Sequence, residues 1–227
     1  MKIIPTLCKP IDDLLGGGIE SGILTQIYGA AGSGKTSIAL QCALGCVSKG
    51  GKVVYVVADS SFPRKRFLQI SRRFGGLDLC KFLLLSPRSF SEQSNIIDSI
   101  EMLVKEGVQL IVFDSVGSLY RYAMSLDREE NVYFSMELCR QMAMLLHVAE
   151  RSDVAVMILN QARGGPRKDA EAGFAPVGSQ VVGPWCNVSL RLEIAGGPGC
   201  RKAILEKHHR HAVGGSATFS PSALGAS

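Results

Sequence analysis

The chain has 227 residues, of which 46% are hydrophobic, 20% are charged and 7% are aromatic, and its formal net charge is +5. This composition excludes a disordered or fibrous protein, and the length suits one α/β domain with a substantial core better than two full domains. The mild positive charge permits an anionic partner without requiring one.

Short apolar runs typical of β-strands recur along the chain. The middle four consist almost entirely of Val, Ile, Leu and Phe, as expected for strands that are covered on both faces of a sheet. We predict strands at 23–28, 53–57, 82–85, 110–113, 154–159 and 188–194.

Helical patterns fill the intervals between these strands. One helix follows Gly34 and runs to about Val47, a second starts near Pro63 and ends near Phe74, and a third starts at the capping-box pair Ser89 and Glu92. A long helix is expected from about residue 129 to 151. Alternation of strand and helix favours right-handed crossovers and a mostly parallel sheet.

The pattern changes after Pro184. Short strands near 188–194, 201–206 and 216–220 are joined by glycine-rich turns. We interpret them as an antiparallel extension at one edge of the sheet. Residues 1–220 are therefore expected to form a single core, and residues 221–227 a flexible tail.

A phosphate-binding motif follows the first of the six predicted strands. GAAGSGKT, Gly29 to Thr36 (Gly29, Ala30, Ala31, Gly32, Ser33, Gly34, Lys35 and Thr36), fits G-x-x-x-x-G-K-[ST] and opens a helix. Glycines allow a loop to wrap around a β-phosphate, while its amides and the helix N-terminus face the anion. Lys35 can reach the β- and γ-phosphates, and Thr36 can offer its hydroxyl to Mg²⁺. The motif predicts a site for ATP and Mg²⁺.

Two further strands end in an acid. LIVFDS, residues 110–115, places Asp114 at the tip of a buried strand, where an acid can hold Mg²⁺ through a water molecule. YVVADS, residues 55–60, leads directly into Asp59. If the Asp59 strand neighbours the strand before the phosphate loop, its carboxylate faces the γ-phosphate and can serve as a general base or orient water. The alternative is a solvated loop acid that helps to start the next helix.

The seven cysteines form no C-x-x-C pair, which argues against a zinc ribbon or a thioredoxin-like site. Cys42 and Cys46 are one helical turn apart and are expected to be small core residues. No stretch reaches the ~18 apolar residues of a membrane span, and the first five residues are too short for a signal peptide. We expect a soluble, cytoplasmic protein with free thiols.

Several segments resemble the RecA/RadA recombinase family in the order in which that family has them. IDDLLGGGIESGILTQIYGAAGSGKT (residues 11–36) resembles the opening of the family's ATPase core. FDSVGSLYR (113–121), VAVMILNQ (154–161) and VVGPWCNVSLRLE (181–193) match later landmarks. The resemblance covers roughly residues 7–220 and implies a RecA-like P-loop NTPase core. Because the chain starts almost at this core, the helical N-terminal domain of full RadA recombinases is expected to be absent, as in the archaeal RadB subfamily.

The resemblance also implies catalytic roles. Asp59 falls where the family usually has a catalytic glutamate, and Gln161 matches its γ-phosphate-sensing glutamine. Because aspartate is one methylene shorter than glutamate, and catalysis is sensitive to ångström-scale misplacement, we expect slow ATP hydrolysis. Gln161 has an alternative role as a turn residue that satisfies backbone groups at the strand end.

Two loops face DNA in the family geometry. One spans about 122–130 and contains Arg128; the other spans 162–178 and contains Arg163, Arg167 and Lys168. Their cations can neutralise phosphates in a sequence-independent, salt-sensitive manner. Acidic residues in the second loop lower its net positive charge, so we expect weak DNA binding. Single-stranded DNA is the expected partner. A solvated basic loop is the alternative.

The run EKHHRH at 206–211 is the other concentrated polar segment. By resemblance, Lys207 and Arg210 are candidates for contacts with a nucleotide held by a neighbouring subunit. The three histidines invite a metal interpretation, but on a strand they would alternate sides. A solvated edge strand is the simpler interpretation.

Three functions fit these features. The leading one is an ATP- and DNA-binding accessory protein of homologous recombination and DNA repair, which acts with a recombinase or a DNA-junction nuclease. The others are a KaiC-like signalling ATPase without a DNA role, and a nucleotide-gated adaptor for a recombinase or nuclease partner in which hydrolysis is vestigial.

Overall fold

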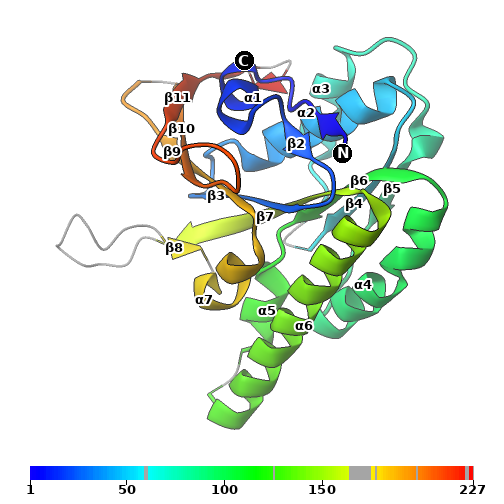
Figure 1. The fold of residues 1–227 in the computed structure, drawn as a ribbon, viewed down its shortest axis with the longest axis vertical. Coiled ribbons are helices and arrows are strands. Elements are labelled where there is room, and N and C mark those ends of the chain that lie inside the picture. The colour runs from blue at the N-terminus through cyan, green and yellow to red at the C-terminus, as the bar shows by residue number, and fades with distance from the viewer. Residues whose placement is uncertain are drawn as a thin grey trace.

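The computed structural model describes residues 1–58, 61–124, 126–163, 175–176, 178–197, 199–222 and 225–226. A mostly parallel sheet runs through the middle of the molecule, with helices on both faces (Figure 1). Its strands follow the order β11-β10-β9-β3-β7-β6-β4-β5, and β8 pairs with β7. These strands are β3 (Leu24–Gly29), β4 (Lys52–Val57), β5 (Phe82–Leu85), β6 (Val108–Asp114), β7 (Ala155–Arg163), β8 (Ala175–Pro176), β9 (Val188–Ile194), β10 (Arg201–Lys207) and β11 (Ser216–Phe219).

Helices α1 (Lys9–Leu15), α2 (Lys35–Ser48) and α3 (Arg64–Ser71) lie on one side of the sheet, and α4 (Phe90–Lys105), α5 (Ser118–Ala123) and α6 (Arg128–Ser152) lie on the other (Figure 1). A short α7 (Ser179–Val182) precedes β9, and two single turns of 3₁₀ helix lie at Leu79–Lys81 and Gly183–Trp185. All six predicted strands and all four predicted helices are present, so the α/β fold class is confirmed.

Two hydrophobic cores form because strand side chains alternate between the two faces of the sheet. In β4, Val53, Tyr55 and Val57 enter the core beneath α1 and α2, whereas Val54 and Val56 enter the core beneath α4 and α6. Both faces of β4 are therefore covered, which explains its unbroken apolar sequence.

The predicted helix start at Ser89 is confirmed in detail. The Ser89 hydroxyl accepts a hydrogen bond from the Glu92 amide at 3.1 Å, and the Glu92 carboxylate accepts one from the Arg88 amide at 2.8 Å. The Ser89 side chain thus satisfies a backbone donor of the first turn of α4, and the Glu92 side chain binds the amide of the residue that precedes the cap.

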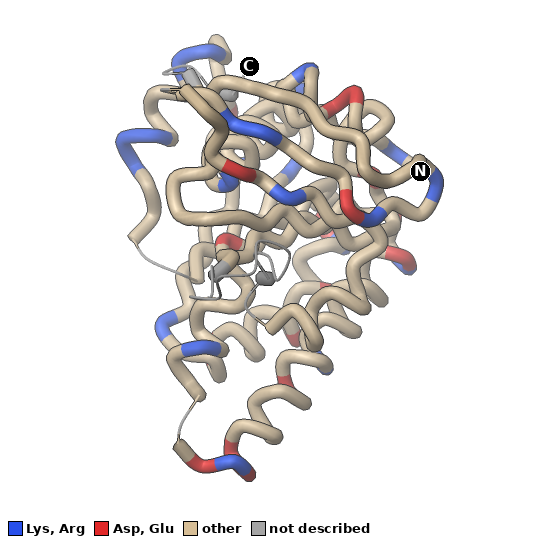
Figure 2. The backbone as a smooth tube through the Cα atoms, turned by 90° about the vertical axis from the view of Figure 1, so that its left-hand side faces the viewer, with Lys and Arg blue, Asp and Glu red and all other residues tan. Residues whose placement is uncertain are grey.

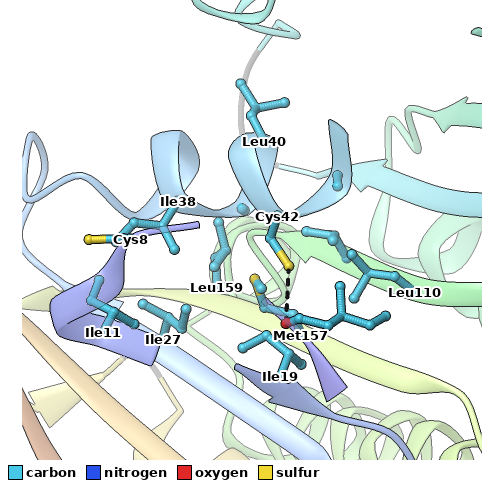
Figure 3. Packing of buried hydrophobic residues seen from close by; sticks show 14 of the residues in the cluster. Cys8, Ile11, Ile19, Ile27, Ile38, Leu40, Cys42, Leu110, Met157 and Leu159 are labelled. Carbon is cyan, nitrogen blue, oxygen red and sulfur yellow. Dashed lines mark hydrogen bonds between the residues drawn. The ribbon is translucent and has the colours of Figure 1, made fainter. Parts of the chain in front are cut away.

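The first 22 residues contain elements that their sequence did not indicate. β1 (Ile3–Ile4) pairs with β2 (Ile19–Glu20), and α1 lies between them. Ile11 and Ile19 pack in the same core as Cys42 of α2 (Figure 3). Cys42 and Cys46 are buried free thiols, which confirms their predicted core role.

The C-terminal strands differ from the prediction in one respect. β9 was expected to belong to an antiparallel extension, but it pairs parallel to β3. Antiparallel pairing begins only between β9 and β10 and continues from β10 to β11. The short turn between β9 and β10 explains this switch, because parallel strands need a long crossover.

The expected tail starts with two paired strands. β12 (Pro221–Ser222) pairs with β13 (Gly225–Ala226), and β13 lies against α2. The boundary between core and tail at residue 220 stays a prediction. Among the described helices, none is long and apolar enough to span a bilayer.

Candidate functional site

The phosphate motif forms a tight loop between β3 and α2. Gly34, the residue that precedes α2, has φ +103°, a left-handed conformation that favours glycine. A Cβ on Gly29 would lie 2.2 Å from the backbone oxygen of Leu192, so only glycine fits between β3 and β9 here. The two glycines allow the loop to curl over the N-terminus of α2, where backbone amides favour an anion.

Lys35 folds its ammonium group into this loop. The Nζ atom donates to the backbone oxygens of Gly29 and Ala30, both at 2.8 Å, and its side chain is largely buried. Carbonyl oxygens thus hold a positive charge inside a loop that has the shape to enclose a phosphate. Lys35 and the loop amides together provide both the charge and the donors that a polyphosphate needs.

Asp114 lies at the tip of β6 and joins Thr36 to a residue that sequence reasoning missed. Its Oδ2 atom accepts a hydrogen bond from the Thr36 hydroxyl at 2.9 Å and one from the Tyr55 hydroxyl at 3.1 Å. Tyr55 is fully buried in β4, and its burial, followed by the nearby Asp114 charge, raises its pKa well above the ordinary value. Tyr55 therefore stays protonated and can donate at any physiological pH. The one signal in the sequence was a tyrosine among the valines of the run 53–57.

The donor set at this point fits Mg²⁺. A threonine hydroxyl and a carboxylate are hard oxygen ligands, and the structure places them within hydrogen-bond distance of each other. The described residues contain no cluster of three or more His, Cys, Asp or Glu side chains that could hold a metal ion. Mg²⁺ usually relies on one or two protein groups together with phosphate oxygens.

A hollow of about 380 Å³ opens in front of the loop. Two arginines that the motif search missed lie in its wall: Arg66 Nε donates to the Ser37 hydroxyl at 2.9 Å, and Arg201 Nε donates to the Gly32 backbone oxygen at 2.9 Å. They come from α3 and β10, so only the tertiary fold brings their charge to the loop. The lining residues are Gly32, Gly34, Lys35, Thr36, Ser37, Arg66, Arg201 and Pro221.

Gln161 lies near the end of β7, directly beside the loop. Its backbone is in register with Gly29 in the parallel pairing of β3 with β7, and its side chain is half-buried. The structure thus brings Gln161, Asp114 and the loop to the same carboxyl edge of the sheet, where open α/β sheets bind ligands.

Asp59 lies outside the described residues. Its strand β4 does not neighbour β3, because β7 and β6 lie between them, so the expected adjacency is wrong. β4 instead pairs with β6, with Val57 in register with Asp114. The crossover after β3 skips two strand positions, which a strand pattern alone does not reveal.

The predicted DNA residues are only partly described. Arg128 is exposed at the start of α6, at the end of that helix far from the sheet (Figure 1). Asp127, Glu129 and Glu130 flank it, and Figure 2 shows both charges together at the lower end of the molecule. Arg163 ends β7, and Arg167 and Lys168 lie outside the described residues.

The polar run 206–211 is a strand only in its first two residues, which end β10, and the chain bends after them. β10 ends at Lys207, whose Nζ lies 3.4 Å from the backbone oxygen of Gly183. Arg210 forms an ion pair with Glu20 at 2.9 Å. The ring of His208 stacks on that of His209, with 4.9 Å between the ring centroids, and the ring centroids of His208 and His211 are 4.4 Å apart. The histidines do not alternate sides as they would on a strand, because the chain turns there towards β11.

We expect Tyr55→Phe to weaken the effect of Mg²⁺ on nucleotide binding several-fold while metal-free affinity stays unchanged. The substitution removes the hydrogen bond from Tyr55 to the Asp114 carboxylate and should also lower the free energy of unfolding by about 1.5–3 kcal/mol. Fluorescence titrations with a labelled ATP analogue, with and without Mg²⁺, measure the first effect. Tyr28→Phe is the matched control, because Tyr28 donates to the Glu206 carboxylate away from the loop. Equal Mg²⁺ dependence in both variants would contradict a positioning role for Tyr55.

Comparisons with known proteins agree with this geometry. A family model described as Rad51 matches residues 1–207. The chain is 34% identical to the "DNA repair and recombination protein RadB" of Methanococcoides burtonii, over 96% of this chain and 94% of that protein. It is 35% identical to the protein of the same name from Thermococcus onnurineus, over 96% and 93%. A solved structure titled "Crystal structure of the RadB recombinase" superposes with a TM-score of 0.81 and 33% identity, covering 99% of this chain and 98% of the other.

Proposed function

The chain belongs to the Rad51 family, and from this membership we propose that it is an ATP- and DNA-binding protein of homologous recombination and DNA repair. The relatives that match almost its whole length carry the name "DNA repair and recombination protein". The observation that best supports the proposal is the hydrogen bond between Thr36 and Asp114 beneath a complete phosphate loop.

Each residue of the site has a role in binding the nucleotide. The loop amides and Lys35 bind the β- and γ-phosphates, and Thr36 and Asp114 hold Mg²⁺, Asp114 through a water molecule. Mg²⁺ neutralises charge on the phosphate oxygens as the terminal phosphoryl group is transferred. Arg66 and Arg201 add positive charge at the mouth of the hollow. Gln161 is proposed to sense the γ-phosphate from the strand beside the loop.

Hydrolysis is proposed to be slow, because the catalytic acid is Asp59 rather than glutamate. We expect Asp59→Glu to raise single-turnover ATP hydrolysis by roughly 10-fold or more, since a 1 Å misplacement can cost about 100-fold. Rapid mixing of the variant with ATP and Mg²⁺ measures the rate. Asp78→Glu, at the exposed N-cap of the 3₁₀ helix Leu79–Lys81, adds the same methylene elsewhere and should leave the rate unchanged. A wild-type rate equal to that of a full recombinase would contradict slow hydrolysis, and an unchanged Asp59→Glu rate would indicate a loop acid.

DNA binding is proposed to be weak and independent of base sequence. Arg128 and the loop containing Arg163, Arg167 and Lys168 supply the cations, and the acids beside them reduce the net attraction for phosphates. Such a protein suits an accessory or mediator role beside a RadA-type recombinase or a DNA-junction nuclease. Lys207 and Arg210 are proposed to reach a nucleotide on a neighbouring copy when copies assemble, which requires Arg210 to leave its ion pair with Glu20.

ATP turnover with and without single-stranded DNA is the central test of this function. We expect slow Mg²⁺-dependent turnover that single-stranded DNA stimulates, and DNA affinity that falls as salt rises. If the chain binds no DNA and its ATP turnover is the same with and without DNA, a signalling ATPase would be favoured. Nucleotide binding with turnover no higher than that of Lys35→Ala would favour an adaptor.

A further inference from the structure

One segment of the chain carries its whole net charge. Residues 61–77, SFPRKRFLQISRRFGGL, contain five lysines and arginines and no acid. The chain has 25 lysines and arginines and 20 acids, so the rest of the molecule is balanced at 20 of each. On the side of the molecule that faces the viewer in Figure 2, the two charges are interspersed. In this segment, which forms α3 and the turn after it, all charged residues are cations.

Four of the five cations point away from the protein body. Arg64, Lys65, Arg72 and Arg73 are exposed, and none of them forms an ion pair with a carboxylate in the part of the chain that the structure describes. We call these four residues the α3 basic surface. Positions 65 and 72 are seven residues apart, which is close to two full helical turns, so they lie on the same side of the helix about 10.5 Å apart. Arg64 and Arg73 lie to either side of this pair.

The apolar side chains of the same segment point inward. Phe67 and Phe74 pack against the core beneath α1 and α2, and Ile70 is fully buried in that core. Of the large apolar side chains in the helix, only Leu68 is strongly exposed. Protein interfaces place aromatic and apolar side chains at their centre. The α3 basic surface consists of four cations in a segment that contains no acid, which favours a polyanion as its ligand.

The surface borders a second hollow beside the nucleotide site. This hollow of about 710 Å³ opens at the first turn of α3, and Arg64, Lys65 and Arg66 line it together with Leu84 of β5. Arg66 lines the nucleotide hollow as well, so the two hollows share one guanidinium. Guanidinium groups bind phosphate through paired hydrogen bonds, and three of the four outward cations are arginines.

We propose that the α3 basic surface binds the sugar–phosphate backbone of DNA as a second contact, separate from the two loops that follow β6 and β7. The inference rests on the proposed DNA-binding function and adds a site to it. The four exposed cations can contact the closely spaced phosphates of a nucleic acid strand, and no acid within the segment offsets its charge. Because α3 also supplies Arg66 to the nucleotide hollow, DNA on this surface lies next to the ATP site.

The test uses two double variants and a matched control in the full chain. Arg64→Gln/Lys65→Gln and Arg72→Gln/Arg73→Gln each remove two charges from the surface and leave Arg66 intact. Lys49→Gln/Arg151→Gln removes two exposed cations at the C-terminal ends of α2 and α6, outside the segment 61–77. Anisotropy of a fluorescein-labelled single-stranded oligonucleotide over a salt series gives the affinity and its salt slope. Thermal melting and binding of a labelled ATP analogue confirm that each variant folds.

Each surface variant should bind more weakly than wild type, with a salt slope smaller by about 1.4, since each lost phosphate contact changes the slope by ~0.7 for single strands. The control variant should keep the wild-type slope. Surface variants with the wild-type slope would overturn this site alone, whereas a wild-type chain that binds no oligonucleotide would overturn the DNA part of the proposed function too. Poly-glutamate of equal charge is added as a competitor. If it displaces the oligonucleotide from the wild type but not from the surface variants, the surface binds an acidic protein segment, and the assignment to nucleic acid is overturned.

Discussion

Lys35→Ala is expected to lower ATP affinity by roughly 30-fold or more and to bring turnover to background. The ammonium of Lys35 is largely buried in the loop and held by two backbone oxygens, so no other side chain can replace it there. Truncation of one partner of a buried, hydrogen-bonded charge pair costs about 2–5 kcal/mol. Equilibrium binding of a labelled ATP analogue and a coupled turnover assay measure the two effects.

Lys49→Ala is the matched control for this prediction. Lys49 follows the C-terminal end of α2, the helix that Lys35 begins, and its side chain is exposed. The control should keep wild-type affinity and turnover, because it removes the same group far from the phosphates. ATP affinity in Lys35→Ala equal to that of the control would refute the assignment of the phosphate site.

Asp114→Asn is expected to weaken Mg²⁺ binding in the presence of nucleotide by about 10–100-fold, the usual loss when a residue that orients metal ligands is changed. Asparagine keeps the shape and can still accept from Thr36 and Tyr55, but it removes the negative charge. Metal-free nucleotide affinity should not fall, because a carboxylate near phosphates repels them. Mg²⁺ titrations of nucleotide binding and turnover provide the measurement.

Asp98→Asn is the control for the loss of a carboxylate. Asp98 pairs with Arg140 on the outer surface of α4, away from the loop. Its variant should keep the wild-type Mg²⁺ midpoint. The metal assignment fails if the Mg²⁺ midpoint of Asp114→Asn is also that of wild type.

Much of the fold was predictable, because it depends on local periodicity. Unbroken runs such as 53–57 and 110–113 identified strands that are buried on both faces, and the spacing of Ser89 and Glu92 located the start of α4. The order of the strands was not predictable in the same way. Nothing in the run before Asp59 shows that β7 and β6 lie between β4 and β3, because a crossover can skip positions in a sheet.

The candidate site was also predictable only in part. The sequence by itself predicted the phosphate loop, because a strand, eight consecutive residues and a helix start lie within one stretch of chain, and it predicted the acid at position 114 from the strand that precedes it. Only the tertiary structure placed Arg66, Arg201 and Tyr55 around it. Arg66 and Arg201 lie 29 and 169 residues from their partners in the loop region, and Tyr55 lies 59 residues from Asp114. Contacts over such separations are set by how sheet and helices pack, and they leave no spacing in the sequence from which they can be recognised.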